Sequence, residues 1–190
     1  MKTLYISLKI FLFFIVLTGI IYPLFVTGIA QLTFHSKANG SLIIKDNKLI
    51  GSELIGQRFD TAIYFNSRPS AVSYNPLPSG GSNFGLTNAR LKHTVDSLKN
   101  QFIIFNQLNP LSEIPSEMVF ASASGLDPHI SPQAALLQVD RIVKIRQFDN
   151  TKKQRLLGSI AELSESPQYL LLGEQRINVL LLNLKLDEIK

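Results

Sequence analysis

The chain has 190 residues and a net charge of +5, with 45% hydrophobic and 17% charged residues. This length suits one soluble domain with a sizeable core, and the basic residues lack the clustering that nucleic-acid binding requires. There is no cysteine, which excludes disulfides, thiolate metal sites and cysteine nucleophiles. The three histidines are scattered and lack a ligand spacing such as H-E-x-x-H, so no metal site is predicted.

The N-terminal segment 10–34 is uncharged and strongly apolar. Its densest part, residues 10–30, would span about 31 Å as a helix, which matches the hydrocarbon core of a bilayer. A cleaved signal peptide is the alternative, but its apolar region usually has about 7–15 residues and is followed by an A-x-A-like site, which is missing here. The sequence predicts an uncleaved transmembrane helix over 10–34 after a short cytoplasmic N-terminus, residues 1–9.

Three residues of this segment favour packing against other helices. Pro23 removes a backbone donor, so we expect a local kink, with the freed carbonyl bound by Thr18, a neighbouring helix or water. Gly19 and Gly28 are small enough for another helix to approach closely.

The charges around the helix predict its orientation. Lys2 and Lys9 precede it, and cytoplasmic flanks carry an excess of lysine and arginine. The lysines that follow it are mixed with acidic residues. We therefore predict a single-pass membrane protein, with its N-terminus inside and a single soluble domain, residues 35–190, outside the cell.

The first part of that domain is predicted to be β-structure and loop. Residues 41–50 form two apolar, β-prone runs around Asp46-Asn47, which is typical of a hairpin. Residues 64–65 are predicted as a further short strand. Residues 66–87 are rich in Asn, Ser, Pro and Gly, which indicates a loop.

A helix is predicted to begin at Thr87 or Asn88, either of which can cap it. Its apolar positions recur at helical spacing: Leu91, Val95, Leu98, Phe102 and Phe105. Residues 117–122 then resemble a strand.

A second helix is predicted from Pro132, with Ser131 as its N-cap. Its buried face is expected to be Ala135, Leu136, Val139, Ile142 and Val143. A third helix is predicted over 152–163, with Thr151 as cap and an inward face of Leu156, Leu157, Ile160 and Leu163. Residues 176–187 are predicted to form a final strand. About three helices with strands at both ends predict an α+β fold with a mixed sheet behind the membrane helix.

Four residues of the strand-to-helix turn have the chemistry of a hydrolase triad: Ser122, Ser124, Asp127 and His129. Triad members normally converge from separate elements, whereas these lie within eight residues and their flanks do not read G-x-S-x-G. Short polar side chains also shape turns by bonding to the backbone. No catalytic residue is therefore predicted. We interpret this turn as a candidate interaction surface. The less favoured alternative is an anchored hydrolase that uses Ser124 and His129.

A Gly-rich loop before the first soluble helix is a weak candidate for phosphate binding: Ser79, Gly80, Gly81, Ser82 and Asn83. Backbone N–H groups in such loops can hold an anion. No Gly-Lys-Ser/Thr follows, so the loop is not a P-loop, and a flexible loop explains it equally well.

Several strings resemble one protein family, the small C subunit of the bacterial Kdp-type potassium-transporting P-type ATPase. The most specific is A-S-A-S-G-L-D-P-H-I-S-P at 121–132, and the others lie at 38–43, 51–57, 64–65, 68–71, 79–83 and 172–180. The resemblance extends from the anchor to the C-terminus and implies that the membrane is the cell membrane of a bacterium. The family usually has Pro at the positions of Leu86 and Gln175, and often Thr at that of Phe120, but none of these departures removes a candidate ligand.

The resemblance implies a complex in which a channel-like subunit carries potassium and a P-type ATPase subunit hydrolyses ATP. It implies a non-catalytic accessory subunit that supports assembly and raises the ATP affinity of the catalytic subunit. ATP and potassium therefore enter only at the level of the complex. A direct ATP role would make the chain a nucleotide-binding chaperone on the cytoplasmic side, which is the alternative hypothesis and conflicts with the predicted orientation.

Overall fold

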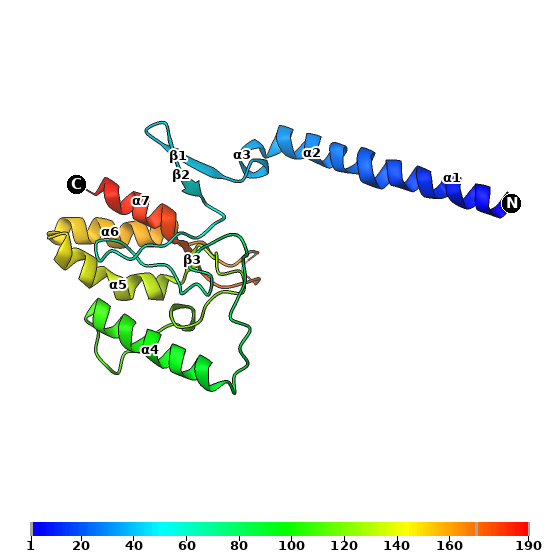
Figure 1. The fold of residues 1–190 in the computed structure, drawn as a ribbon. Helices are drawn as coiled ribbons and strands as arrows, with labels where there is room; N and C mark the ends of the chain where they lie inside the picture. The colour runs from blue at the N-terminus through cyan, green and yellow to red at the C-terminus, as the bar shows by residue number, and fades with distance from the viewer. Residues whose placement is uncertain (1, 170, 190) are drawn as a thin grey trace. The chain divides into compact units, whose positions relative to one another are not determined.

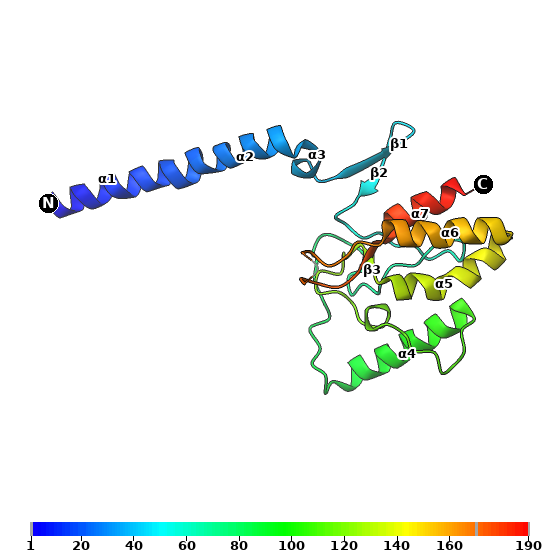
Figure 2. The same cartoon turned by 180° about the vertical axis from the view of Figure 1, so that it is seen from behind.

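The computed structural model describes residues 2–169 and 171–189. The chain divides into two compact units, Met1–Ser52 and Glu53–Lys190, which Figures 1 and 2 show from opposite sides. Helices and small antiparallel sheets are combined in the described residues. The predicted α+β class with a preceding apolar helix is therefore confirmed.

The first unit begins with a continuous helix made of α1 (Lys2–Val16), a π turn η1 (Leu17–Ile21) and α2 (Tyr22–Thr33). The helix has 32 residues, a mean hydropathy of 2.5 over its most apolar window, and no buried residue in that window. Of the described helices, it is the one that is long and apolar enough to cross a membrane. It starts earlier than the predicted residue 10, so it includes both basic residues of the N-terminus.

The helix accommodates Pro23 through the π turn directly before it. The backbone N–H of Tyr22 bonds to the carbonyl of Leu17, five residues back, and such π bulges are a known response to an interrupted helix ladder. Thr18 Oγ donates to the carbonyl of Phe14 at 2.7 Å. Of the three partners considered for the carbonyl freed by Pro23, Thr18 is therefore not used, because its hydroxyl is bound to Phe14.

The first unit ends with a short helix α3 (His35–Ala38) and a hairpin of β1 (Leu42–Lys45) and β2 (Lys48–Ser52). The strands pair antiparallel, with an irregularity between Ile43 and Ile44. Asp46 and Asn47 both have positive φ values, 51° and 58°, as a two-residue type I′ turn requires. The predicted hairpin and its Asx turn are confirmed.

The second unit contains α4 (Ala89–Asn106), α5 (Pro132–Ile145), α6 (Asn150–Leu163) and α7 (Val179–Glu188). Each of these helices packs on the next one along the chain, as Figure 1 shows. A two-stranded antiparallel sheet joins β3 (His129–Ile130) to β4 (Ile177–Asn178). In place of one mixed sheet, the described residues form two separate two-stranded sheets.

Side-chain caps fix where these helices begin. Asn88 accepts hydrogen bonds from the N–H groups of residues 90 and 91, and Ser131 accepts one from residue 134 at 3.1 Å, so both predicted caps are confirmed. Helix α6 is capped by Asp149, which accepts from the N–H of Lys152 at 2.7 Å. The prediction that Thr151 caps this helix is wrong. The carboxylate of Asp149 both accepts the hydrogen bond and interacts favourably with the positive end of the helix dipole.

The predicted strand over 176–187 is correct only at Ile177 and Asn178. Asn178 accepts hydrogen bonds from residues 180 and 181 and so begins helix α7. Leu182 and Leu186 then lie four residues apart, both fully buried. Leucine is a strong helix former, so the helical spacing prevails over the short alternation after residue 183.

The other two predicted strands are also wrong. In place of the strand over 117–122, the chain forms a short 3₁₀ helix η2 (Ser116–Met118) followed by a turn, in which the N–H of Phe120 donates to the carbonyl of Ser116 at 2.9 Å. Residues 64–65 have no neighbouring strand in the described chain. Their backbone groups bond instead to side chains of two helices: Asn183 binds both the N–H and the carbonyl of Phe65, at 2.8 and 3.0 Å, and Arg141 binds the carbonyl of Tyr64.

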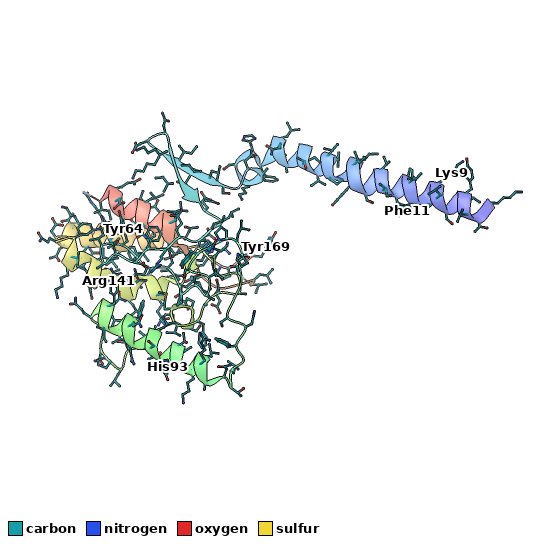
Figure 3. All side chains as sticks on the ribbon, in the orientation of Figure 1. Lys9, Phe11, Tyr64, His93, Arg141 and Tyr169 are labelled. Atoms are coloured by element: carbon teal, nitrogen blue, oxygen red, sulfur yellow. The ribbon has the colours of Figure 1, made fainter. Side chains whose placement is uncertain are left out.

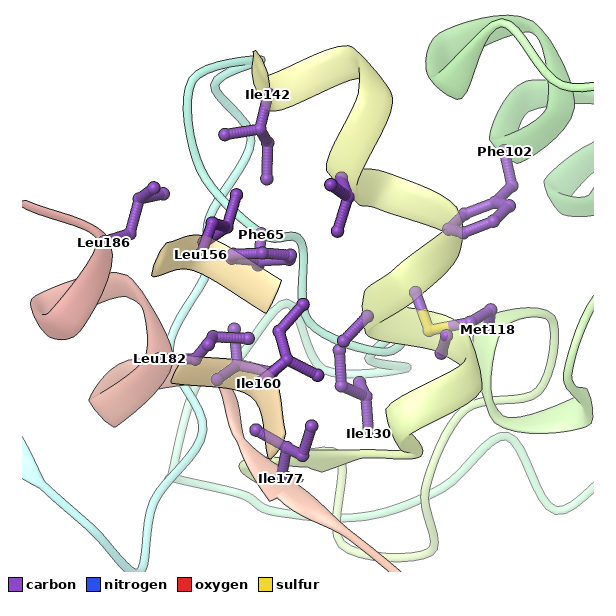
Figure 4. Close-up of a cluster of buried hydrophobic side chains, with 14 residues drawn as sticks. Phe65, Phe102, Met118, Ile130, Ile142, Leu156, Ile160, Ile177, Leu182 and Leu186 are labelled. Atoms are coloured by element: carbon purple, nitrogen blue, oxygen red, sulfur yellow. The ribbon is translucent and has the colours of Figure 1, made fainter. Parts of the chain in front are cut away.

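The core lies between the helices and the 64–65 segment (Figure 4). Its buried members include Phe65, Phe102, Met118, Ile130, Ile142, Leu156, Ile160, Ile177, Leu182 and Leu186. The predicted inward faces of the second and third helices are largely confirmed, except that Leu136 is half exposed. Helix α4 differs more, because only Phe102 of its predicted stripe is buried, together with Ile103 and Asn106.

Candidate functional site

The turn at 121–131 is held by three loops that are distant from it in sequence. Each loop donates a hydrogen bond to a carbonyl of the turn, so the loops and the turn form one connected surface. The pairs are Gly56 N–H to Leu126 O at 2.7 Å, Ser70 Oγ to Gly125 O at 2.7 Å, and Gly80 N–H to Ser124 O at 3.0 Å.

Gly125 is required at the centre of this turn. Its φ is +68°, a region that L side chains rarely adopt. A Cβ atom there would lie 2.6 Å from a methyl carbon of Val72 and 2.9 Å from the carbonyl oxygen of Gly80. The close approach of the loops therefore depends on the absence of a side chain.

A charged cluster of three side chains lies where the turn meets β3. Arg68 Nη1 donates to one oxygen of Asp127 at 2.7 Å. The other oxygen of Asp127 accepts from the backbone N–H of His129 at 3.0 Å and lies 3.2 Å from its ring Nδ1. The sequence singles out Asp127 and His129, and the structure adds Arg68, whose only signal was its place in the R-P-S-A string at 68–71.

These contacts control the ionisation of Asp127. Burial alone would raise the pKa of its carboxyl, but hydrogen bonds from the ring and the N–H of His129 and the charge of Arg68 outweigh it and lower the pKa to about 2. The carboxylate is therefore ionised under all ordinary conditions and keeps the cluster together.

This pKa predicts how stability depends on pH. Asp127→Asn is expected to lower the free energy of unfolding by about 1–2 kcal/mol at neutral pH, allowing for the partial exposure of the carboxylate. Because the folded pKa of about 2 is below the ordinary value of 3.8, the stabilisation is present above pH 3.8 and is lost as the pH falls through 2. Urea denaturation of the detergent-solubilised protein and variant between pH 2 and 7 would measure it. A difference that is independent of pH would contradict the prediction, and Asp96→Asn on the exposed face of α4 is the control.

An open cleft of about 740 Å³ lies beside the cluster. Its lining includes Arg68, Glu117, Asp127, His129, Glu165 and Arg176. Arg176 pairs with Glu165 at 2.9 Å, and Glu117 accepts the N–H of Ser131 at 3.1 Å. Most of the charges are thus already matched within the chain, which suits a polar contact surface better than a site that selects one charged ligand.

The two serines of the turn do not approach the histidine as a nucleophile would. Ser124 Oγ accepts the N–H of Leu126 at 3.1 Å, and Ser122 Oγ is buried without a hydrogen-bond partner. A triad requires the base to bond to the nucleophile, and no such bond joins either serine to His129 among the described residues. The arrangement is that of a structural turn, and its role as an interaction surface stays a prediction.

The Gly-rich loop from Ser79 to Asn83 packs against the same turn. The N–H of Gly80 is used in the bond to Ser124, and a Cβ at Gly81 would lie 3.3 Å from the carbonyl oxygen of Ala123. The first N–H groups of α4 are bound by the side chain of Asn88. These contacts leave little of the backbone for a phosphate group, and phosphate binding by this loop stays untested.

The feature that sequence reasoning missed is a buried arginine on α5. Arg141 is 2% exposed, and burial lowers the pKa of its guanidinium to about 10. Its nitrogens donate to Asn106 Oδ1 at 2.8 Å, to the Tyr64 carbonyl and Asn66 Oδ1 at 3.0 Å each, to Gln138 Oε1 at 3.1 Å, and to the Ala62 carbonyl. The signal in the sequence was its position among Gln138, Val139 and Ile142, on the apolar face of the helix.

Arg141 and its neighbours position the segment that leads to the site. The side-chain oxygen of Gln138 accepts from the N–H of Asn66 at 2.7 Å, and its side-chain nitrogen donates to the carbonyl of Asn66 at 3.3 Å. The backbone from residue 62 to 66 is therefore held by helix side chains, two residues before Arg68. We infer that this buried polar network fixes the position of the Arg68–Asp127 pair.

Within the described residues, no group of three His, Cys, Asp or Glu side chains is arranged to hold a metal ion. That the chain binds no metal ion stays a prediction.

The geometry of the turn and the cleft does not identify the family of this chain, but comparison with known protein families does. A family model described as KdpC, K⁺-transporting ATPase, c chain, matches residues 4–188. The chain belongs to the KdpC family. The match covers both units, so the family predicted from the sequence strings is confirmed.

Several members of the family are similar over nearly their whole length. The potassium-transporting ATPase KdpC subunit of Caldanaerobacter subterraneus subsp. tengcongensis is 44% identical over 186 residues, 97% of this chain and 94% of that protein. The subunits of Polynucleobacter asymbioticus and Leptospira interrogans are 45% and 41% identical, over 95% and 96% of this chain and 95% and 92% of theirs. With its long exposed apolar helix, this KdpC-family chain is a membrane-associated protein.

Proposed function

We propose that the chain is a non-catalytic accessory subunit of an ATP-driven potassium-import complex, in which it supports assembly and stability. The observation that carries this proposal is the family match over residues 4–188, from a family of ATPase c chains whose members keep nearly the same length. The serines and His129 of the turn do not form a nucleophile–base pair, which supports a role without chemistry. The partners in this proposal are a channel-like potassium-translocating subunit and a P-type ATPase subunit.

The membrane helix is the proposed attachment to the channel-like subunit. Apart from the backbone of their own helix, no atom of the described residues lies within 4 Å of where a Cβ of Gly19 or Gly28 would stand, so both leave room for close approach by another helix. The π turn before Pro23 adds irregular geometry that a partner helix can match.

Deleting residues 1–34 is expected to release the remaining domain from the complex, because the proposed helix contacts are lost. Co-purification with affinity-tagged channel-like subunit would measure the release. An anchor of the same length with an unrelated apolar sequence separates membrane attachment from helix packing. Recovery of a complete, active pump with the deletion would sink the proposal.

We also propose that the soluble domain lies outside the cell, since Lys2 and Lys9 precede the helix. The chain has no cysteine, so Gln147→Cys introduces a unique thiol at an exposed position. We expect an impermeant maleimide to label it in intact cells. Labelling only after the membrane is permeabilised would contradict this orientation and favour the alternative, a nucleotide-binding chaperone on the cytoplasmic side.

The ATP effect is proposed to be indirect. A domain outside the membrane cannot touch a nucleotide bound inside, so any rise in the ATP affinity of the catalytic subunit would pass through assembly of the complex. The occupied N–H of Gly80 and the capped start of α4 support this view over direct binding at Ser79–Asn83.

A further inference from the structure

A hairpin at 165–176 projects from the second unit immediately before β4. Glu165 and Arg176 exchange backbone hydrogen bonds at 2.9 and 3.2 Å, and their side chains form an ion pair at 2.9 Å. Gln168 and Leu172 close the turn, with the N–H of Gln168 bonding to the carbonyl of Leu172 at 2.8 Å. The described residues 165–169 and 171–176 are thus joined by paired backbone groups and have an ion pair at their base, and Figure 3 shows Tyr169 at the periphery of the domain.

The tip of this hairpin is apolar and exposed. Tyr169 is 87% exposed, Leu171 86% and Leu172 61%. Residues 166–173 read S-P-Q-Y-L-L-L-G and carry no charge. Contiguous exposed apolar side chains mark sites that contact a membrane or another protein, and the tip groups three of them within four residues.

We propose that this tip inserts into the interfacial layer of the bilayer that holds the chain's own helix. The apolar helix ends at Thr33 and the second unit begins at Glu53. The linking segment, residues 34–52, contains α3 and the β1–β2 hairpin, so this chain itself tethers the second unit to the bilayer and needs no other subunit to meet lipid.

The composition of the tip fits a lipid surface. Tyrosine is enriched at the level of the headgroups, and leucines gain free energy when they leave water for the acyl boundary. The ion pair of Glu165 and Arg176 at the base limits insertion to the apolar tip. This inference rests on the proposed function in one respect, that the helix holds the domain at a membrane.

The absence of tryptophan permits a direct test in the full-length protein. Tyr169→Trp introduces a unique indole, and the variant is reconstituted into phosphatidylcholine vesicles without any other subunit. We expect a blue shift of its emission relative to an indole exposed to buffer, and quenching by lipids brominated about 5–10 Å below the headgroups, the depth of interfacial insertion. Leu111→Trp, at a position 91% exposed elsewhere in the second unit, is the matched control and should be neither shifted nor quenched.

A second variant separates insertion from an incidental approach to lipid. Adding Leu171→Asp and Leu172→Asp to Tyr169→Trp should abolish both the blue shift and the quenching. If the indole of Tyr169→Trp behaves like that of Leu111→Trp in vesicles, the proposal is overturned. If it becomes shielded only when the other pump subunits are present, a protein contact replaces the lipid contact, which also overturns it.

Co-purification of Tyr169→Trp with the other subunits reports separately on the accessory function, so the two proposals can fail independently.

Discussion

Replacing Arg141 with methionine is expected to lower the free energy of unfolding by about 3–5 kcal/mol. Arg141 is 2% exposed, and its guanidinium binds two backbone carbonyls, at residues 62 and 64, and three side-chain amides. Methionine fills a similar volume but donates no hydrogen bond, so these acceptors lose their donor while they are buried. The loss exceeds what removing one surface charge would cause.

Urea denaturation of the detergent-solubilised protein, followed by circular dichroism, would measure this change. Arg155→Met on the exposed face of α6 is the control and should change the stability by less than about 0.5 kcal/mol. Equal effects of the two substitutions would show that the network around Arg141 does not stabilise the domain.

The same variant tests whether the network positions the site. If it does, Arg141→Met should also weaken the Arg68–Asp127 pair, so Asp127→Asn should destabilise the variant less than it destabilises the unmodified protein. Additive effects of the two substitutions would mean that Arg141 and Asp127 act independently.

Gly125→Ala is expected to be nearly as damaging, with a loss of about 2–5 kcal/mol in the free energy of unfolding. Alanine at φ +68° costs about 1–2 kcal/mol in backbone strain, and forcing a methyl group into a filled space costs typically about 1–3 kcal/mol more. The methyl would collide with Val72 and with the carbonyl of Gly80. We therefore expect the Gly-rich loop to separate from the turn.

Gly158→Ala is the matched control for this substitution. Gly158 lies inside α6, has no positive φ, and has nothing within 4 Å of where a Cβ would stand, so alanine there should stabilise the protein by about 0.5–1 kcal/mol. Thermal unfolding of both variants would show shifts of opposite sign. A neutral Gly125→Ala would contradict the close contact of the loops.

The elements that the sequence predicted well are those specified by neighbouring residues. The Asp46-Asn47 turn, the Asn88 and Ser131 caps and the apolar N-terminal helix all follow from interactions within a few residues. Composition and local hydrogen bonds decide such features without help from the rest of the fold.

The failures came where a distant partner decides the backbone. Residues 64–65 look like a strand, but their hydrogen-bond partners are side chains of Asn183 and Arg141, far along the chain. The segment after Asn178 alternates like a strand at its end, yet burial of Leu182 and Leu186 against the core selects a helix. Neither partner is visible in a local window of sequence.

The sequence by itself therefore determined the membrane attachment, the α+β class, the family and two members of the charged cluster, Asp127 and His129. Tertiary structure alone decided that Arg68 completes this cluster and that Arg141 is a buried structural cation. It also decided that the turn at 121–131 is clamped by three separate loops. The physical reason is that hydrophobic periodicity and capping act over a few residues, whereas the pairing of buried polar groups depends on which distant segments meet in the folded domain.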